Sequence, residues 1–237
     1  MIRNLLLTGG VSHDFDVTAP VLAGVLAENP ACGSVESTIV SSPDAAFAAL
    51  RSAQIGECPP WDLVTVYALW WRMLDDRYAP LRAEWSYEAV PDDLALLHDH
   101  VDRGGALLAL HTAVICFDAA PAWADLVGAT WNWERSGHPP LGPVEATVTA
   151  HGSAHPVSAG VHDFTVIDEL YGNLDGAPTE PLLSARHGET TQPLLWTRSV
   201  GRGRVVVDLL GHDTRSLSHP SHRRVLQQAT AWAVQAQ

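Results

Sequence analysis

Four ionisable side chains stand just after apolar segments of this sequence: His13, His111, Glu169 and His212. An imidazole titrates near neutral pH, so it can serve as an acid or a base, and a nearby carboxylate completes a pair for proton transfer. Imidazole and carboxylate groups are also common ligands of first-row metals such as zinc. Both chemistries stay open at this point, and we predict that these four residues are catalytic.

The segment that places His111 is the apolar run 106–110, which enters from Gly104-Gly105. A short apolar run between turn signals is typical of a strand that helices cover on both faces. The side chain after such a strand lies at the carboxyl edge of the sheet, where open α/β proteins bind ligands. We therefore expect His111 to lie at a binding edge.

The rest of the chain alternates between β-rich and helical segments, which predicts one α/β domain over residues 1–237. We predict strands over residues 4–8, 35–40, 62–68, 144–148, 164–171, 181–185, 193–197 and 204–210. We predict helices over 17–28, with Asp16 or Thr18 as the cap, and over 43–54, 91–103, 121–127 and 223–234. His98 and His100 are predicted on the surface of the third of these helices.

The amino-acid composition of the chain restricts the classes of partner that it can bind. The chain carries 27 acidic and 14 basic residues, a net charge of −13, which argues against nucleic acid and against anionic membrane surfaces. The three cysteines are widely spaced, and no apolar run is long enough for a membrane span. We expect a cytoplasmic protein with a small-molecule substrate, and a homo-oligomer is compatible with the sequence.

Aromatic residues stand near the candidate catalytic positions. The loop 131–140 contains Trp131, Trp133 and His138, and we predict that these line a substrate site. Trp70-Trp71 form either a packed aromatic shelf, an oligomer contact or a surface on which a sugar stacks. The other predicted substrate-binding residues adjoin the four catalytic candidates: Asp14, Phe15, Tyr171 and Asp213.

The sequence resembles the ThuA-like family of trehalose utilisation, and the matching motifs follow the family's order along nearly the whole chain. They are Gly9-Gly10-x-x-His13-Asp14-Phe15, Gly104-Gly105 with Leu110-His111-Thr112-Ala113, His155-Pro156, Asp168-Glu169-Leu170-Tyr171, Pro193-x-x-Trp196-Thr197, Gly201-x-Gly203-Arg204-Val205 and Gly211-His212-Asp213. The resemblance implies a flavodoxin-like three-layer fold related to class I glutamine amidotransferases, with a mainly parallel central sheet and an antiparallel extension. It also implies a role in carbohydrate catabolism, on glycosides that a partner dehydrogenase has oxidised to 3-keto sugars.

The related amidotransferases present a nucleophilic cysteine after the central strand, and the aligned position here is His111. Cys116 lies five residues further on, so a glutaminase has no thiolate where it needs one. We reject glutamine amidotransfer and interpret Cys116 as a small buried residue.

Three functions remain open. The first is proton transfer on a keto-glycoside or related sugar, with His111 or Glu169 as base and with His13 and His212 binding or polarising the substrate. The second is a hydrolase or lyase that depends on zinc or manganese held by the same four residues. The third is a non-catalytic sugar-binding or regulatory protein.

Overall fold

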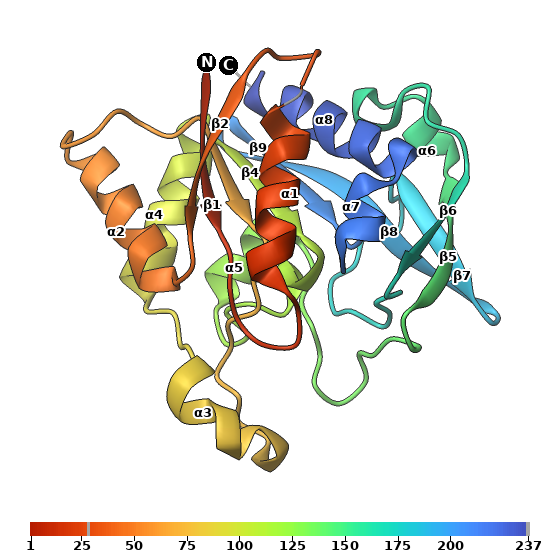
Figure 1. The fold of residues 1–237 in the computed structure, drawn as a ribbon, viewed down its shortest axis with the longest axis horizontal. Coiled ribbons are helices and arrows are strands. Elements are labelled where there is room, and N and C mark those ends of the chain that lie inside the picture. The colour runs from red at the N-terminus through yellow and green to blue at the C-terminus, as the bar shows by residue number, and fades with distance from the viewer. Residues whose placement is uncertain (28, 236–237) are drawn as a thin grey trace.

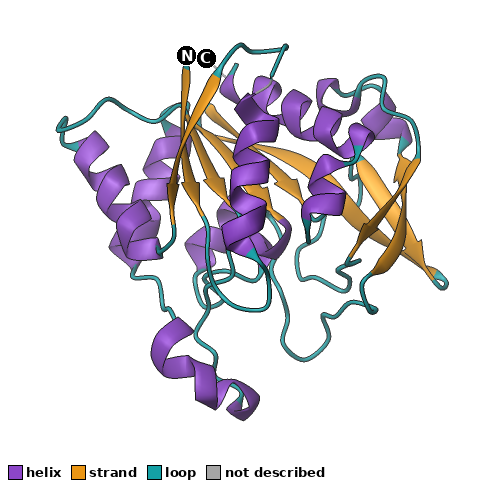
Figure 2. Cartoon of the chain, viewed as in Figure 1, coloured by secondary structure: helices purple, strands orange, loops and turns teal. Residues whose placement is uncertain are grey.

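A nine-stranded sheet runs through the protein, in the order β2-β1-β3-β4-β9-β8-β7-β5-β6 (Figures 1 and 2). This computed structural model describes residues 1–27 and 29–235. The strands are β1 (Ile2–Leu7), β2 (Val35–Val40), β3 (Leu63–Val66), β4 (Ala106–Leu110), β5 (Gly142–Val148), β6 (Phe164–Asp168), β7 (Leu183–His187), β8 (Thr190–Val200) and β9 (Gly203–Asp208). The pairs from β2 to β9 are parallel, and those from β9 to β6 are antiparallel. This confirms the predicted α/β fold with an antiparallel extension, and the parallel part has the flavodoxin-like order.

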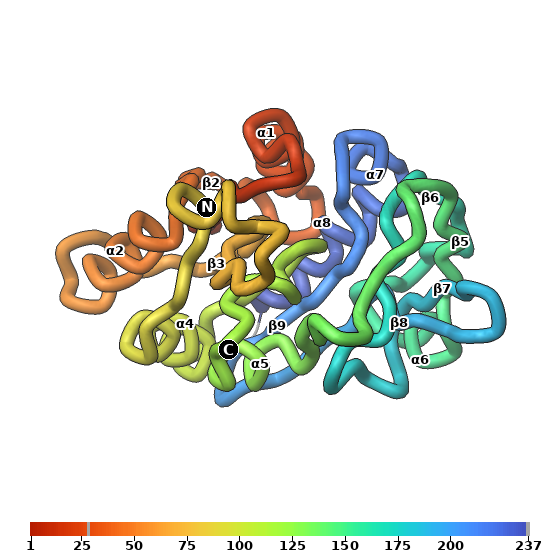
Figure 3. Tube along the Cα trace, turned by 90° about the horizontal axis from the view of Figure 1, so that it is seen from below, coloured from red at the N-terminus to blue at the C-terminus, as the bar shows by residue number. Residues whose placement is uncertain are grey.

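Helices cover both faces of the sheet, as Figure 3 shows along the edge where the parallel strands end. One layer contains α1 (Phe15–Ala27), α7 (Thr214–Ser218) and α8 (Pro220–Val234). The opposite layer contains α2 (Pro43–Gln54), α4 (Pro91–Asp102) and α5 (Pro121–Val127). The shorter elements are α3 (Ala79–Trp85), α6 (Ala150–Ser153) and the 3-10 turns η1 (Asp76–Tyr78), η2 (His111–Val114) and η3 (Pro156–Ser158).

Strand β4 lies in the middle of the sheet between β3 and β9, and all five of its residues are buried. Its apolar sequence suits that position, because helices exclude water from both faces and no polar side is needed. The turn that follows β4 is therefore held by a rigid support, and it carries His111.

One excursion from this architecture was not predicted. Between β3 and α4 the chain forms η1 and α3, and all their residues are exposed or half-buried. Figure 1 shows α3 standing away from the sheet on the side where the parallel strands end. The segment lacks the apolar periodicity that identifies a core helix, so the sequence gives little signal for it.

The first helix begins earlier than predicted. It starts at Phe15, because the Asp14 carbonyl accepts hydrogen bonds from the Val17 and Thr18 amides. Asp16 and Thr18 therefore lie inside the first turn and are not its cap. The predicted end, Glu28, lies outside the described residues.

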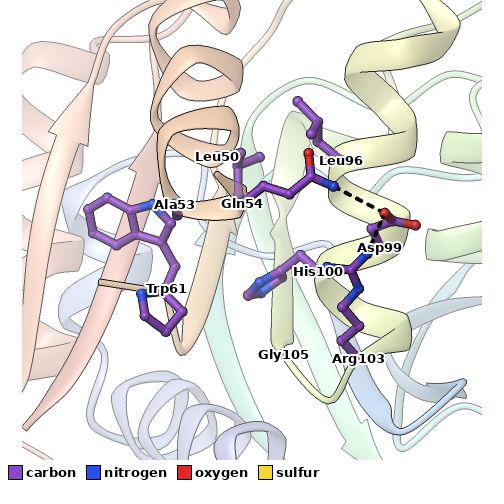
Figure 4. A pocket seen from close by; sticks show the side chains of 10 residues that line it. Leu50, Ala53, Gln54, Trp61, Leu96, Asp99, His100, Arg103 and Gly105 are labelled. Atoms are coloured by element: carbon purple, nitrogen blue, oxygen red, sulfur yellow. Dashed lines mark hydrogen bonds and ion pairs between the residues drawn. The ribbon is translucent and has the colours of Figure 1, made fainter. Parts of the chain in front are cut away.

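His100, predicted on the helix surface, is half-buried. Its Nε2 lies 3.0 Å from the Ala106 carbonyl oxygen, and burial lowers its pKa. Figure 4 shows His100 in a pocket between α2 and α4, opposite Trp61, where a cavity of about 260 Å³ is also lined by Gly105. Since Gly105 precedes β4, this pocket lies at the other edge of the sheet from His111. It holds none of the four candidate catalytic residues.

Among residues 1–27 and 29–235, the helices are too short or too polar to cross a membrane.

Candidate functional site

The backbone at His111 is held in an unusual conformation. His111 has a φ of 51°, in the left-handed region that non-glycine residues seldom adopt. It stands between β4 and η2, at a sharp turn from strand to helix. Such a conformation costs free energy and persists where the surrounding structure fixes it, which is common at functional sites. The turn directs the imidazole into the fold, where the whole residue is buried.

The structure brings all four predicted catalytic residues together. His13 Nε2 lies 3.1 Å from His111 Nε2 and 3.0 Å from His212 Nδ1. Glu169 Oε2 lies 3.3 Å from His212 Nδ1, 3.7 Å from His111 Nε2 and 3.9 Å from His13 Nε2. These four ligand atoms all lie within 4.8 Å of one another. We call the group the strand-end cluster, because its members follow β1, β4, β6 and β9.

Hydrogen bonds fix which nitrogen of His111 faces the cluster. His111 Nδ1 lies 2.8 Å from the Leu209 carbonyl oxygen. A carbonyl oxygen only accepts, so Nδ1 carries a proton and the neutral imidazole presents a lone pair on Nε2. That lone pair points at His13 Nε2 and at the Tyr171 hydroxyl, which is 3.2 Å away.

The charges in the cluster are strongly perturbed. Burial, with the electrostatic influence of the neighbouring His111 and His212 imidazoles, lowers the pKa of His13 to about 3. Burial alone would raise the pKa of Glu169, but its interactions with His111 and His212 outweigh burial and hold the pKa well below its usual range. The bond to Glu169 raises the pKa of His212. The carboxylate is therefore ionised and His13 is neutral at physiological pH.

Asp168 holds two of the loops in place. Its buried carboxylate accepts hydrogen bonds from the backbone amides of Gly211 at 2.7 Å, His212 at 3.2 Å and Glu169 at 2.8 Å. It thereby joins the end of β6 to the loop after β9. From the sequence, one of the two adjacent carboxylates Asp168 and Glu169 is expected to be functional or paired to a histidine, and Glu169 is the one predicted in the site. A buried carboxylate needs such partners, but backbone amides are present at every residue other than proline, so the sequence does not show which of them bind Asp168.

Comparisons with known proteins agree with this architecture. A model of the ThuA family, described as trehalose utilisation, matches residues 83–233. The chain belongs to the ThuA family. A search of curated proteins gave no match.

Solved structures show the same fold over almost the whole chain. A ThuA-like protein from Parabacteroides merdae matches with a TM-score of 0.74 and 18% identity, over 99% of this chain and 90% of that chain. A ThuA-like protein from Bacteroides uniformis gives 0.69 and 15%, over 98% and 90%. A protein from Salmonella typhimurium, described as cytoplasmic, gives 0.60 and 12%, over 98% and 99%. At these identities the likeness shows the fold of the ThuA family and nothing further.

Three of the predicted substrate-binding residues in this ThuA-family chain border the strand-end cluster directly. The Tyr171 ring stacks on His111 at a centroid distance of 4.7 Å. His138 Nδ1 lies 3.5 Å from Glu169 Oε1, and the Phe15 ring stacks on His13 at 5.4 Å. Tyr171 is buried, and burial together with the nearby carboxylates raises its pKa well above the usual range. It therefore stays protonated and can donate a hydrogen bond.

The other predicted binding residues lie further out. The Trp131 ring packs edge-on against Tyr171 at 5.3 Å, and Trp133 lies beyond Trp131 at 6.3 Å. Asp14 precedes α1, and its carbonyl is used by that helix. Asp213 caps α7, where its carboxylate accepts from the Arg215 and Ser216 amides. The capping bonds explain the Asp213 side chain as a helix-start residue, and the place of both aspartates in a binding site stays a prediction.

Cys116 is buried, as predicted. Its Sγ lies 3.0 Å from the Ala68 carbonyl oxygen, and burial raises the pKa of the thiol to about 12. A thiol with that pKa is not a nucleophile at neutral pH, which is consistent with the rejection of a glutaminase mechanism.

Proposed function

We propose that this chain is a divalent-metal-dependent enzyme that acts on a sugar carrying a ketone, such as a 3-keto-glycoside. The observation that carries the proposal is the convergence of three imidazole nitrogens and one carboxylate oxygen in the strand-end cluster. The choice of a sugar as substrate rests on the family's description as trehalose utilisation. The proposal of a metal rests on the spacing of the ligand atoms in the strand-end cluster.

The number of hydrogen bonds that the cluster's imidazoles can make with one another favours a bound cation. His111 Nε2 presents a lone pair, and His13 Nε2 lies 3.1 Å from it and 3.0 Å from His212 Nδ1. One proton on His13 Nε2 can make a good hydrogen bond to only one of those two nitrogens. A cation at the centre would be attracted by every lone pair and by the Glu169 carboxylate.

The spacing of the ligand atoms fits a first-row metal. Zinc binds nitrogen and oxygen at about 2.0–2.2 Å in tetrahedral sites, which places neighbouring ligand atoms about 3.3–3.6 Å apart. Five of the six separations among these four atoms range from 3.0 to 3.9 Å, and all lie within 4.8 Å. Three histidines and one carboxylate suit zinc, and manganese is the alternative with greater preference for oxygen.

A bound metal would supply Lewis-acid polarisation of a ketone oxygen, which makes the neighbouring C–H bond more acidic. Tyr171 would donate a hydrogen bond to the same oxygen, because its raised pKa keeps the hydroxyl protonated. His111 and Glu169, as ligands, are then not available as the base. The candidate base is therefore the imidazole that lies beside the cluster without belonging to it.

That imidazole is His138, whose side chain is 36% exposed. Its Nδ1 lies 3.0 Å from the Pro139 carbonyl oxygen, so Nδ1 carries the proton and Nε2 keeps a lone pair. In the proposed reaction Nε2 takes the proton from the carbon next to the ketone. The electron pair of that C–H bond forms an enediolate, which then expels the glycosidic oxygen from the adjacent carbon while the His138 imidazolium returns its proton to that oxygen, so that the alcohol leaves neutral.

A cytoplasmic location also stays part of the proposal. The cysteines Cys32, Cys58 and Cys116 are free thiols, as is usual in a reducing compartment.

The test is turnover of several 3-keto-glycosides, detected by mass, with the protein first stripped of metal and then supplied with zinc or manganese. The proposal predicts release of the alcohol only after metal is restored. Turnover at the same rate without metal would contradict the metal requirement. Binding of these sugars without any turnover would instead favour a sugar-binding protein.

A further inference from the structure

An open cavity lies at the edge of the sheet opposite the strand-end cluster. It has a volume of about 260 Å³ and is bordered by α2, α4, the loop before β3 and the start of β4 (Figure 4). The walls that the two helices provide are largely apolar, with Leu50, Ala53 and Leu96. Pockets for drug-sized molecules are larger, about 300–1,000 Å³, so this cavity suits a molecule of one or two rings.

Two aromatic rings on opposite sides of this cavity are fixed in place. The Arg3 guanidinium lies 4.3 Å from the centroid of the Trp61 ring, and the Trp61 indole Nε1 donates to a carbonyl oxygen of α2 at 3.4 Å. Across the cavity, the His100 ring lies against Gly105, where a Cβ would overlap the ring atoms. Its bond to the Ala106 carbonyl oxygen at 3.0 Å holds the ring as well. The cavity is therefore preformed.

The polar groups of the lining are mainly hydrogen-bond acceptors. Because His100 Nε2 donates to a carbonyl oxygen, Nδ1 is the nitrogen left for a ligand, and burial lowers the pKa of His100, which keeps the ring neutral. Asp99 Oδ2 accepts from Gln54 Nε2 at 3.3 Å and from Arg103 at 3.2 Å, so Asp99 Oδ1 and Gln54 Oε1 keep lone pairs for a ligand. The Arg103 side chain, 63% exposed, can donate to a ligand acceptor. A ligand must therefore bring its own N–H or O–H donors.

The charges beside the cavity disfavour an anion. An adjoining hollow between α2 and α4 is lined by Arg51, Asp92 and Asp99. Each guanidinium here already has a carboxylate partner, since Arg51 pairs with Asp93 at 2.7 Å and Arg103 pairs with Asp99 at 3.2 Å. Asp92 adds a further negative charge, so a phosphate group would meet no net positive charge.

The shape and polarity of the walls favour a flat heterocycle over a sugar. The hydroxyls of a hexose point outward all around its ring, so some would face leucine side chains without a partner. A nucleobase has two apolar faces and carries its N–H donors and its acceptors along the edge. We propose that this cavity is a second ligand site, which binds an uncharged nitrogen heterocycle of nucleobase size with an exocyclic amino group. The proposal is independent of the proposed function, because none of the four cluster residues lines the cavity.

The test is isothermal titration calorimetry of the full chain with adenine, cytosine, glucose and dimethyladenine, in which two methyl groups replace the amino hydrogens. Adenine or cytosine should bind with a Kd below about 1 mM. Dimethyladenine should bind about 3- to 10-fold more weakly than adenine, because it cannot donate from its amino group, and glucose should bind more weakly still. Absence of binding of both bases up to about 1 mM, or tighter binding of glucose, would overturn the proposal.

Variants show whether the base binds in this cavity. Leu96→Trp fills the cavity and should weaken binding by more than about 10-fold. His100→Phe keeps a ring but removes the acceptor, and Gln54→Ala changes an exposed residue with little risk to folding; each should weaken binding by about 2- to 10-fold. His98→Ala, in a half-buried histidine of the same helix outside the lining, is the matched control and should bind as wild type does, as should His111→Ala. Unchanged affinity in the cavity variants, or lost binding in His111→Ala, would place the ligand elsewhere and overturn the proposal.

Discussion

Two groups of histidine and carboxylate lie near the end of β9, and their buried charges are compensated in different ways. One is the strand-end cluster. The other, which we call the buried pair, is His222 on α8 with Asp208 at the end of β9, both fully buried. The comparison shows in which of the two groups hydrogen bonds alone satisfy the imidazole nitrogens, without a bound ion.

In the buried pair every imidazole nitrogen faces an acceptor. His222 Nε2 lies 3.2 Å from Asp208 Oδ2, and His222 Nδ1 lies 3.0 Å from the Ser216 carbonyl oxygen. The second oxygen, Asp208 Oδ1, accepts from the Leu210 amide at 3.0 Å. Burial alone would lower the pKa of His222, but the charge and hydrogen bond of Asp208 outweigh it and raise that pKa. Two protons on one imidazolium satisfy the pair.

In the strand-end cluster three imidazoles share one carboxylate, and their nitrogens face one another. Burial lowers the pKa of His13, and the neighbouring imidazoles lower it further, because protonating more of them would place positive charges about 3 Å apart. Protons on both imidazole nitrogens therefore satisfy the buried pair, whereas the crowded imidazoles of the cluster cannot all be protonated. We infer that the buried pair stabilises the fold, and the proposed function assigns the cation to the cluster.

The largest expected effect is that of removing a ligand. His111→Ala and Glu169→Gln should each weaken zinc affinity by more than about 100-fold, since loss of a supporting residue alone costs 10- to 100-fold. Competition with a chromogenic chelator measures the affinity. His98→Ala, in a half-buried histidine of α4 outside the cluster, is the control. Unchanged zinc affinity in both variants would contradict the claim that the strand-end cluster binds the metal and the buried pair does not.

The second effect concerns the buried pair. His222→Leu leaves Asp208 buried without its charged partner, which should lower the free energy of unfolding by about 3–5 kcal/mol. Urea unfolding of the metal-free protein measures it. The folded variant should still bind as much zinc as wild type. A variant that stays stable yet fails to bind zinc would mean that the pair belongs to the metal site.

The third effect concerns Asp168, which supports the strand-end cluster without belonging to it. Asp168→Asn keeps the shape of the side chain that holds the Gly211, His212 and Glu169 amides, but it removes the charge and one acceptor. Zinc affinity should fall by about 10- to 100-fold, as for residues that orient metal ligands. Asp163→Asn, which alters an exposed carboxylate bonded to the Val148 amide, should leave zinc affinity unchanged.

The smallest effect is a pH dependence of stability. The folded pKa of His222 is raised above its usual value of 6.5. Its contribution to stability is therefore complete below pH 6.5 and is lost as pH rises through the folded pKa, because the unfolded state releases its proton first. The double variant Asp208→Asn/His222→Gln has no titrating group here. The difference in unfolding free energy between wild type and this variant should shrink as pH rises from 5.5 to about 9, and a constant difference would contradict the imidazolium.

The sequence predicted the elements that have a strong local pattern. The apolar run of β4 and the proline and glycine that bound α5 were placed correctly, because burial on both faces and helix-end chemistry act over a few residues. The four cluster residues were also named, since parallel strands must end at one edge. Glu169 differs from the three histidines because it follows a strand of the antiparallel extension and not a parallel strand.

Other features depend on contacts between distant segments, which one sequence does not reveal. His100 was placed on the surface because its helical position is polar, yet the start of β4 packs against it. The hydrogen bonds that link Trp133 through Asp118 to Arg72 join three loops with no shared pattern. The assignment of His222 to a pair with Asp208 likewise needs the fold, since no motif connects them.

The most direct test of the account is the metal content of protein purified without a histidine tag, stripped by chelator, reloaded with zinc or manganese and freed of excess metal. Elemental analysis by mass spectrometry should find about one equivalent in wild type and in His222→Leu, and almost none in His111→Ala. Wild type that retains less than about a tenth of an equivalent of either metal would contradict the claim that the strand-end cluster holds a cation.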